Sequence, residues 1–359
     1  GGHRALFVGG CVRNALLDMP VVDIDIATDA HPEEVMTRAR EAGLKSVPTG
    51  IDHGTITVVS GGLPHEVTTF RADTETFGRH AHVAFGQSIE ADARRRDFTM
   101  NALYATPDGQ VIDPLGGMDD LRARRVRFIG DPGARIREDT LRILRFFRFH
   151  ACYGDPAGGL DPEGLAACAA ARDSLATLSR ERTGAEMRKL LGAPDPAPSV
   201  AAMQAAGVLG AILPGADAAA LAPLVHLESQ TGTAPDPLRR LAALGGADIA
   251  DRLRLSRAEA RRLAHLRDGI AGGMSDAEIG YRFGATDGAD IVLLRAALLG
   301  TPPAPDAFGD LRRGAAATCP VRAADLMPEY SGAALGRRLS EIESRWIASG
   351  FALRREDLL

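Results

Sequence analysis

The chain has 359 residues, of which 45% are hydrophobic and 25% are charged, an ordinary globular composition with room for two or three domains. Its formal net charge of −5 argues against non-specific binding of nucleic acid by the protein as a whole. No stretch approaches the roughly 20 apolar residues of a membrane span, and four scattered cysteines without a C-x-x-C pair favour reduced thiols, so we expect a cytoplasmic protein with no membrane partner.

The first 70 residues predict a small domain in which strands and helices alternate. Runs of β-branched and apolar residues predict strands at 4–8, 21–27, 54–60 and 65–70. Helices are expected over 12–17 and 32–42, the second with two glutamates in its first turn, where the helix dipole favours acids. A Gly-Gly pair joins the last two strands as a hairpin. The order β-α-β-α-β-β predicts a short mixed sheet.

The pattern then becomes polar and, further on, helical. The polar stretch after Arg71 predicts a flexible loop as far as His82, and Asp108-Gly109 predicts a short hairpin. From Ile136 onward, periodic leucines and alanines predict helices, with breaks at 193–198, 214–215, 234–237 and 301–305. We therefore expect an α+β protein, with a small mixed-sheet head followed by an all-helical remainder.

The first chemical motif begins with G-G-C-V-R-N and ends with D-I-D-I-A-T, at residues 9–28. Because side chains alternate faces along a strand, Asp23 and Asp25 are expected close together on one side. Two such carboxylates repel unless a cation lies between them, and oxygen ligands on a short element suit Mg²⁺ together with a triphosphate. The Gly9-Gly10 pair would let backbone amides approach a phosphate, and Arg13 would add a charged fork. An edge strand with two solvated acids is the alternative.

Two further features extend this motif. Glu66 lies in the second strand of the predicted hairpin and becomes a third catalytic carboxylate if that strand neighbours the Asp pair; a surface acid is the alternative. The segment A-R-R-R-D-F-T-M-N-A-L, residues 93–103, places Arg96 before Asp97. An arginine can neutralise a triphosphate and an aspartate can accept from a ribose hydroxyl, although basic triplets also occur on plain surfaces.

The third motif is R-E-D-T-L-R-I-L-R-F-F-R-F, residues 137–149, with arginines at 142, 145 and 148. On one helix, Asp139 and Arg142 would present an acceptor beside a donor fork. Cytosine and adenine both show an amino donor beside a ring-nitrogen acceptor, whereas guanine and uracil show a carbonyl beside an N–H. The pair would therefore accept C or A and reject G and U without a nucleic-acid template. The alternative is a plain intrahelical ion pair.

Together these strings closely resemble the class II tRNA nucleotidyltransferase (CCA-adding enzyme) and poly(A) polymerase family over about residues 6–191. Other matching strings are P-T-G-I-D-H-G-T-I-T-V, D-T-E-T-F-G-R-H-A and L-S-R-E-R-T-G-A-E-M-R-K-L-L. The resemblance implies a nucleotidyltransferase head at 1–130, a helical neck at 131–192 that selects the base, a helical body at 193–300, and a helical tail at 301–359 that binds tRNA.

The resemblance also implies the reaction and its residues. CTP and ATP would supply C, C and A to the 3′ end of tRNA by in-line attack of the RNA hydroxyl on the α-phosphate, releasing pyrophosphate. Asp23 and Asp25 would hold two Mg²⁺ ions. The implied nucleotide-binding set is Gly9, Gly10, Arg13, Arg96, Asp97, Asn101, Asp139, Arg142, Arg145 and Arg148.

Two departures and three alternatives accompany the resemblance. Asn14 stands where the family usually has Asp. Asp18-Met19 stands where the family usually has Gly-Arg or Gly-Lys. The alternatives are poly(A) addition, addition of C alone or A alone, and a catalytically silent RNA-binding homologue. The segment 73–82 resembles the element associated with the switch from C to A addition, which favours the full reaction.

Overall fold

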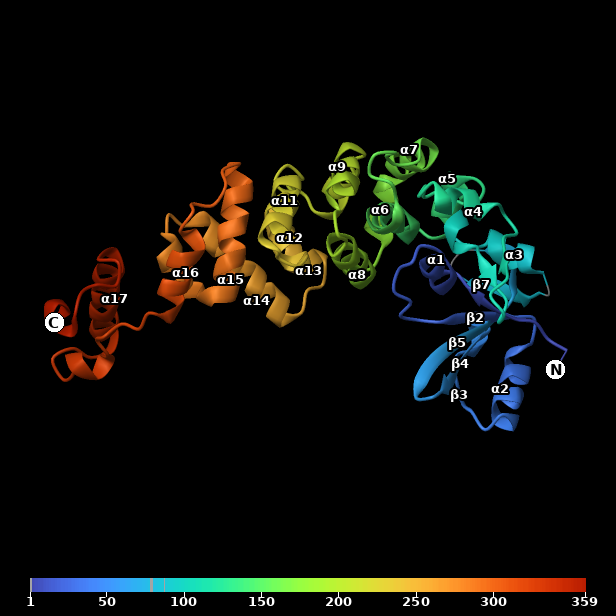
Figure 1. Cartoon of the computed structure of the whole chain (residues 1–359), viewed down its shortest axis with the longest axis horizontal. Coiled ribbons are helices and arrows are strands. Elements are labelled where there is room, and N and C mark those ends of the chain that lie inside the picture. Colours follow the sequence, from blue (N-terminus) through green and yellow to red (C-terminus); the bar gives the residue numbers. More distant parts are fainter. Residues whose placement is uncertain (1, 78–79, 87) are drawn as a thin grey trace. The chain divides into compact units, whose positions relative to one another are not determined.

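The computed structural model describes residues 2–77, 80–86 and 88–359, with the backbone alone at 72–77 and 80–84. The chain forms two compact units, the first of Gly1–Leu178 with Ala205–Ala211 and the second of Ser179–Gln204 with Ile212–Leu359. Figure 1 shows the strands gathered within the first unit and helices along the second. The predicted α+β fold, a mixed-sheet head followed by helices, is confirmed.

A seven-stranded mixed sheet organises the first unit, in the order β3-β4-β5-β2-β1-β8-β9. β2 and β5 run parallel, and the other neighbouring strands run antiparallel. The parallel register aligns Asp25 with Glu66. The short hairpin predicted around Asp108-Gly109 is the β8–β9 pair. The strands are β1 Ala5–Val8, β2 Asp25–Thr28, β3 Lys45–Gly50, β4 Thr55–Ser60, β5 Leu63–Thr69, β8 Tyr104–Ala105 and β9 Val111–Ile112.

Helices cover this sheet and continue the chain beyond it. α2 starts with Pro32, whose fixed φ suits a first helical turn, and packs on β3, β4 and β5 (Figure 1). A buried apolar cluster that includes Leu6, Val8 and Phe70 fixes β1 and β2 against α3. The helices are α1 Gly10–Leu16, α2 Pro32–Glu41, α3 Ile89–Arg94, α4 Gly117–Arg122, α5 Pro132–Glu138, α6 Leu141–Tyr153 and α7 Pro162–Ala170, with 3-10 turns at Ile51–His53, Thr99–Asn101 and Arg172–Thr177.

The strand predicted over 21–27 is wrong at its beginning. β2 starts at Asp25, and Val22 in the irregular segment before it is 85% exposed. The register pairs Phe7 with Ile26, and the chain of β1 turns into α1 just after Val8. In the described sheet, residues 21–24 therefore have no antiparallel strand beside them. β-branched residues alone do not make a strand without a partner.

Two other strand regions were not predicted. The polar stretch expected as a flexible loop contains β6 (Arg71–Phe77) and β7 (His80–Phe85), which pair as an antiparallel ribbon, while residues 78–79 lie outside the described residues. β3 is an edge strand paired only with β4, and it contains Pro48, a residue that edges tolerate. Backbone pairing requires no apolar alternation, so the hydropathy pattern of these two regions does not predict a strand.

The second unit consists of helices among its described residues. The predicted breaks at 193–198, 214–215, 234–237 and 301–305 fall at or near helix ends, and the described chain has no strand after Pro132. No helix of the described chain has the length and apolarity that crossing a bilayer requires. The helices are α8 Arg180–Leu191, α9 Ala197–Ala205, α10 Val208–Ile212, α11 Leu221–Thr231, α12 Pro237–Leu244, α13 Ile249–Arg252, α14 Arg257–Ala271, α15 Asp276–Leu299, α16 Ala307–Ala316, α17 Gly332–Ala348 and α18 Arg355–Leu358, with a 3-10 turn at Ala323–Leu326.

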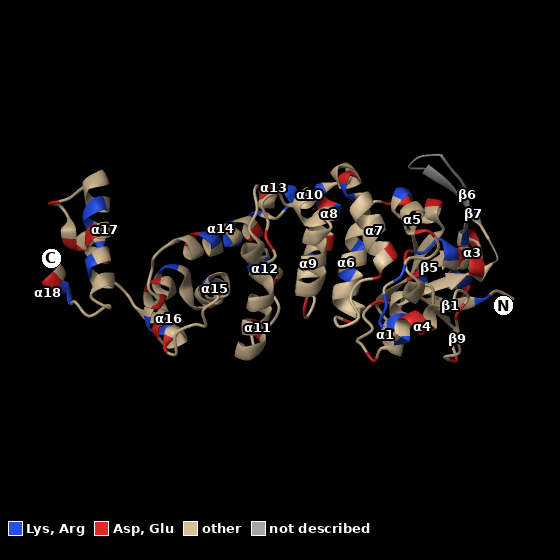
Figure 2. Ribbon diagram, turned by 90° about the horizontal axis from the view of Figure 1, so that it is seen from above, with Lys and Arg blue, Asp and Glu red and all other residues tan. Residues whose placement is uncertain are grey.

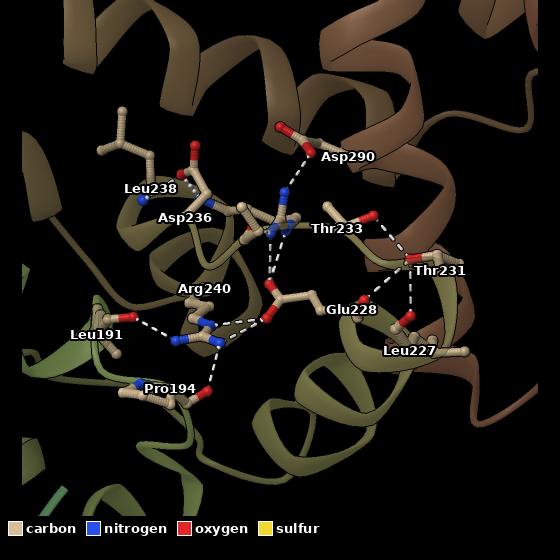
Figure 3. A network of polar contacts seen from close by, with 12 residues as sticks. Leu191, Pro194, Leu227, Glu228, Thr231, Thr233, Asp236, Leu238, Arg240 and Asp290 are labelled. Carbon is tan, nitrogen blue, oxygen red and sulfur yellow. Dashed lines mark hydrogen bonds and ion pairs between the residues drawn. The ribbon is translucent and has the colours of Figure 1, made fainter. Parts of the chain in front are cut away.

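A buried ionic network joins four helices of this second unit (Figure 3). Glu228 of α11 accepts from Arg239 and Arg240 of α12, and Arg239 also pairs with Asp290 of α15 at 2.6 Å. Arg240, only 1% exposed, donates to the carbonyl of Leu191 at the end of α8 and to those of Ala193 and Pro194 just after it. Every buried charge therefore has an opposite partner, which burial requires.

Candidate active site

Gly9 forms the turn between β1 and α1. Its backbone lies at φ 72° and ψ −120°, a region that favours glycine, and its N–H donates to the carbonyl of Leu103 at 3.0 Å. A Cβ added at this position would lie 3.3 Å from Nη1 of Arg96. Gly9 thus lets the chain turn sharply and lets a guanidinium approach the start of α1, where Gly10 is the first residue.

Three carboxylates act on one another around the start of β2. Asp25 is half-buried, Glu66 lies opposite it on β5, and Asp23 is exposed two residues before the strand. Burial raises the pKa of Asp25 above its ordinary value; the charge of Glu66 adds to this rise, Arg96 counters it, and Asp23 adds a smaller contribution. The expectation that both aspartates lie in one strand is wrong, but their charges still interact.

These acids suit a divalent cation that takes part of its coordination from elsewhere. Within the described residues, no three His, Cys, Asp or Glu side chains converge closely enough to hold a metal by themselves. A half-buried Asp25 destabilised by two neighbouring negative charges would be stabilised by a bound cation. Mg²⁺ prefers oxygen ligands, keeps several waters and commonly binds through one or two carboxylates plus phosphate oxygens. The donor set fits such an ion.

Four of the predicted nucleotide-binding residues form one chain of hydrogen bonds. Asp97 is buried; its Oδ1 accepts from Asn101 at 2.9 Å and its Oδ2 accepts from Nε of Arg145 at 2.7 Å. Asn101 in turn accepts from Nη1 of Arg13. Burial opposes ionisation of Asp97, but Arg145 and the hydrogen bonds outweigh it and lower the pKa of this carboxyl. Asp97 is therefore an anion that orders two arginines.

An aromatic side chain that was not predicted organises the arginines. The guanidinium carbons of Arg13, Arg145 and Arg148 lie 5.2, 5.1 and 4.5 Å from the ring centre of Phe149. The Tyr153 ring lies 3.8 Å from the guanidinium of Arg13, and its hydroxyl accepts from Nη2 at 2.8 Å. Positions 145, 149 and 153 share one face of α6, so helical periodicity was the available signal.

Asn14 has a bonding pattern that an aspartate could not reproduce. Its Oδ1 accepts from Nε and Nη2 of Arg13 at 3.1 and 2.8 Å, while its Nδ2 donates to the carbonyl of Pro20 at 2.9 Å. A carboxylate can only accept. Asn14 therefore leaves the positive charge of Arg13 unneutralised and also holds the turn that precedes Asp23.

The predicted pairing of Asp139 and Arg142 along one helix is wrong. Asp139 ends α5 in an extended conformation, with φ −149° and ψ 106°, and its Oδ1 accepts the N–H of Leu141 at 3.1 Å. Arg142 lies in the first turn of α6 and pairs with Glu138 at 2.6 Å, while its Nη2 donates to the carbonyl of Arg95 at 3.2 Å. The two residues therefore do not share a helix, because Asp139 accepts from a backbone N–H in the break between α5 and α6.

Two family models match the chain. The model described as the poly(A) polymerase head domain matches residues 5–127, and the model described as a probable RNA and SrmB-binding site of polymerase A matches residues 159–220. Curated relatives include a CCA-adding enzyme of Bacillus cytotoxicus, 43% identical over 197 residues, and one of Geobacillus stearothermophilus, 43% identical over 216 residues. These alignments cover 54% and 60% of this chain and 47% and 52% of the relatives, so the chain spans about half the length of the curated relatives it matches.

Solved structures show the same fold. A Bacillus stearothermophilus CCA-adding enzyme in complex with CTP is 29% identical, with a TM-score of 0.71 over 97% of this chain and 89% of that one. A Thermotoga maritima CCA-adding enzyme complexed with tRNA is 20% identical, with a TM-score of 0.69 over 99% of this chain and 90% of that one. The second likeness concerns the fold alone.

Proposed function

This chain belongs to the tRNA nucleotidyltransferase and poly(A) polymerase family, and we propose that it adds C, C and A to the 3′ end of tRNA from CTP and ATP, releasing pyrophosphate. The observation that carries the proposal is the strand register that sets Asp25 opposite Glu66, with the charges of Asp23 and Arg96 also acting on Asp25. Acids for divalent cations next to arginines for phosphate are what nucleotidyl transfer requires.

The proposed cofactor is Mg²⁺, held by Asp23 and Asp25. Such ions, when bound, lower the pKa of the attacking hydroxyl and stabilise the leaving pyrophosphate. Glu66 supports the site through its negative charge, which acts on Asp25. Gly9 and Gly10 leave the start of α1 open to a phosphate, and Arg13 and Arg96 neutralise the triphosphate.

The proposed base pocket draws on the segment from Asp97 to Arg148. Arg145 and Arg148 frame the nucleotide, Asp97 with Asn101 orders the arginines and receives the ribose, and Arg142 with Asp139 reads the base edge. In the bound state Arg142 would exchange its ion pair with Glu138 for the base. Because base selection then uses protein side chains, no nucleic-acid template is needed.

We propose that the chain is divided into a head at 1–130, a neck at 131–192, a body at 193–300 and a tail at 301–359. RNA would lie along the helical parts, which follow the head. Basic residues recur along α14 and α17 (Figure 2), namely Arg257, Arg261, Arg262, Arg267, Arg337, Arg338 and Arg345. Contacts from arginine to phosphate release counterions, so affinity for tRNA should fall steeply with salt. The four cysteines are free, which supports work in the reducing cytoplasm.

One assay tests the proposal and separates its alternatives. The protein is incubated with Mg²⁺ and tRNA lacking its 3′ CCA, with CTP and ATP separately and together, and the RNA ends are sequenced. Growth by C-C with CTP alone and by C-C-A with both nucleotides is the expected result. Long A tracts indicate poly(A) addition, and growth by C alone or A alone indicates a partial activity. An unextended end in all reactions would refute the catalytic proposal.

Replacing Arg142 by alanine is expected to reduce the preference for CTP and ATP over UTP and GTP by about tenfold or more, because a bidentate contact to a base contributes about 1–3 kcal/mol of discrimination. The measurement is kcat/KM for each of the four nucleotides. Arg137→Ala removes an arginine that is 76% exposed on α5 and serves as the matched control. Unchanged selectivity in Arg142→Ala would contradict base reading by this side chain.

A further inference from the structure

A buried carboxylate outside the predicted set holds Arg96 in place. Asp92 of α3 is 1% exposed, and its Oδ2 accepts from Nη2 of Arg96 at 3.0 Å and from the hydroxyl of Tyr104 at 2.7 Å. Its Oδ1 accepts from Nε of Arg95 at 2.9 Å and from the backbone N–H of Arg71 at 3.3 Å. Four donors therefore hold this carboxylate, two on each oxygen.

Tyr104 completes the hold on the same arginine. Its hydroxyl, which donates to Asp92, also accepts from Nε of Arg96 at 3.3 Å, and the guanidinium lies 5.5 Å from the centre of the ring. Tyr104 is fully buried, and burial raises its pKa, so the hydroxyl keeps its proton for Asp92. Two buried side chains therefore hold the Nε and Nη2 atoms of the guanidinium.

Asp92 remains an anion in this position. Burial favours its neutral form, but the charges of Arg96 and Arg95 and the hydroxyl of Tyr104 outweigh burial and lower its pKa to about 2. The carboxylate is consequently charged at every pH at which the protein would work, and the tether to Arg96 is a charge-assisted hydrogen bond.

Arg96 stands close to the acids without pairing with them. Its Nη1 lies against Gly9, which follows the end of β1, and the pairing of Phe7 with Ile26 sets that end beside the start of β2, where Asp25 lies. The charge of Arg96 acts on Asp25. A guanidinium near a half-buried carboxylate normally forms an ion pair with it. Across the part of the chain that the structure describes, however, the ion pair of Arg96 is with Asp92 and not with Asp25.

We propose that Asp92 and Tyr104 are positioning residues that hold Arg96 off Asp25, which keeps this carboxylate open to a divalent cation while the guanidinium stays beside the triphosphate site. The inference rests on the proposed function, since it assumes that Asp25 binds the metal. Released from Asp92, Arg96 would move onto Asp25 and compete with the cation. An opposite charge within about 4–6 Å changes carboxylate proton affinity about 10- to 1000-fold, which sets the scale of this competition.

The test measures metal binding without nucleotide or turnover. Mn²⁺ is titrated into the 359-residue chain, and bound ion is measured by electron paramagnetic resonance. Asp92→Asn keeps the shape and removes the charge, and it should weaken Mn²⁺ binding at least about tenfold. Tyr104→Phe removes one neutral hydrogen bond on the tether and should weaken binding about fivefold.

The double variant Asp92→Asn/Arg96→Ala separates positioning from general damage. Without the competing guanidinium, Mn²⁺ binding should return to the wild-type value or exceed it, which no loss of fold would produce. Asp120→Asn is the matched control, because Asp120 is 0% exposed and accepts from Thr99, Arg125 and Arg127. Its charge is not among those that act on Asp25, so its Mn²⁺ affinity should not change.

Each outcome of the Mn²⁺ titration supports or overturns the positioning role of Asp92 and Tyr104. Wild-type affinity in folded Asp92→Asn, or equal loss in the double variant, would overturn the inference and leave the proposed function standing. If Asp92→Asn does not fold, unchanged binding in Tyr104→Phe overturns the inference and weakened binding supports it. If wild-type protein binds Mn²⁺ no better than Asp25→Asn, the proposed metal site itself fails, and the inference fails with it.

Discussion

Asp25→Asn is expected to lower nucleotide incorporation at least about a thousandfold and to make the protein slightly more stable at neutral pH. The first effect follows because removal of one electrostatic contact to developing charge already lowers rates about 100- to 1000-fold, and Asp25 is proposed to hold metal in addition. The second follows because burial, Glu66 and Asp23 all oppose its ionisation in the folded state.

The stability effect has a definite pH window. The folded-state pKa of Asp25 is raised above its ordinary value of 3.8, so the unfolded chain loses this proton first as the pH rises. Ionisation therefore favours unfolding above that value, and the disadvantage becomes constant above the folded-state pKa. The gain in Tm of Asp25→Asn should be present at pH 7 and absent below about pH 3.8.

Incorporation is measured by single-turnover extension of tRNA, and stability by thermal unfolding across pH. Asp23→Ala should lose incorporation as well, but its Tm should change little because Asp23 is exposed and contributes less to the pKa of Asp25. Retained incorporation in either variant would refute the assignment of these two acids to the metals.

Glu228→Ala is expected to destabilise the second unit by about 3–5 kcal/mol, since removal of one partner leaves buried opposite charges uncompensated. Arg239 and Arg240 are 3% and 1% exposed, and both direct their guanidinium groups at Glu228. Urea unfolding followed by circular dichroism gives the free energy of unfolding, with a fall in the transition midpoint as the sign of the effect.

The matched control is an ion pair at the surface of the same unit. Asp310 pairs with Arg313 at 2.5 Å, with side chains 41% and 57% exposed, and Asp310→Ala should change stability by no more than about 1 kcal/mol. Equal losses of unfolding free energy in the two variants would show that the buried network adds no more stability than a surface ion pair.

The sheet and the helical remainder were predictable because local patterns determine them. Runs of apolar and β-branched residues marked β1, β4 and β5, and periodic leucines and alanines marked the helices after Ile136. The polar ribbon β6–β7 was not predictable, since pairing between two strands leaves little trace in hydropathy. The start of β2 depended on where β1 ends, which is a property of the neighbouring strand.

The candidate site divides in a similar way. Residues close in sequence, such as Gly9 and Arg13 or Asp97 and Asn101, could be grouped from their motifs. Phe149 carried a detectable helical spacing, but Asp92 and Tyr104 could not be linked to Arg96 from sequence, because β8 and α3 meet the guanidinium only in the folded chain. The Asp139–Arg142 spacing failed for a local reason, an unrecognised helix cap.

The hydrogen bonds from Arg240 to the carbonyls of Leu191, Ala193 and Pro194 have a practical consequence for dividing this protein into fragments. A chain cut after Gly192 would part the Leu191 carbonyl, at the end of α8, from Arg240, which would keep only Glu228, Ala193 and Pro194 of the acceptors named above. A cut after Leu178 keeps Arg240 and all three carbonyls in one fragment, which also carries Ala205–Ala211 of the first compact unit. A fragment intended to keep these hydrogen bonds should therefore begin at or before Ser179.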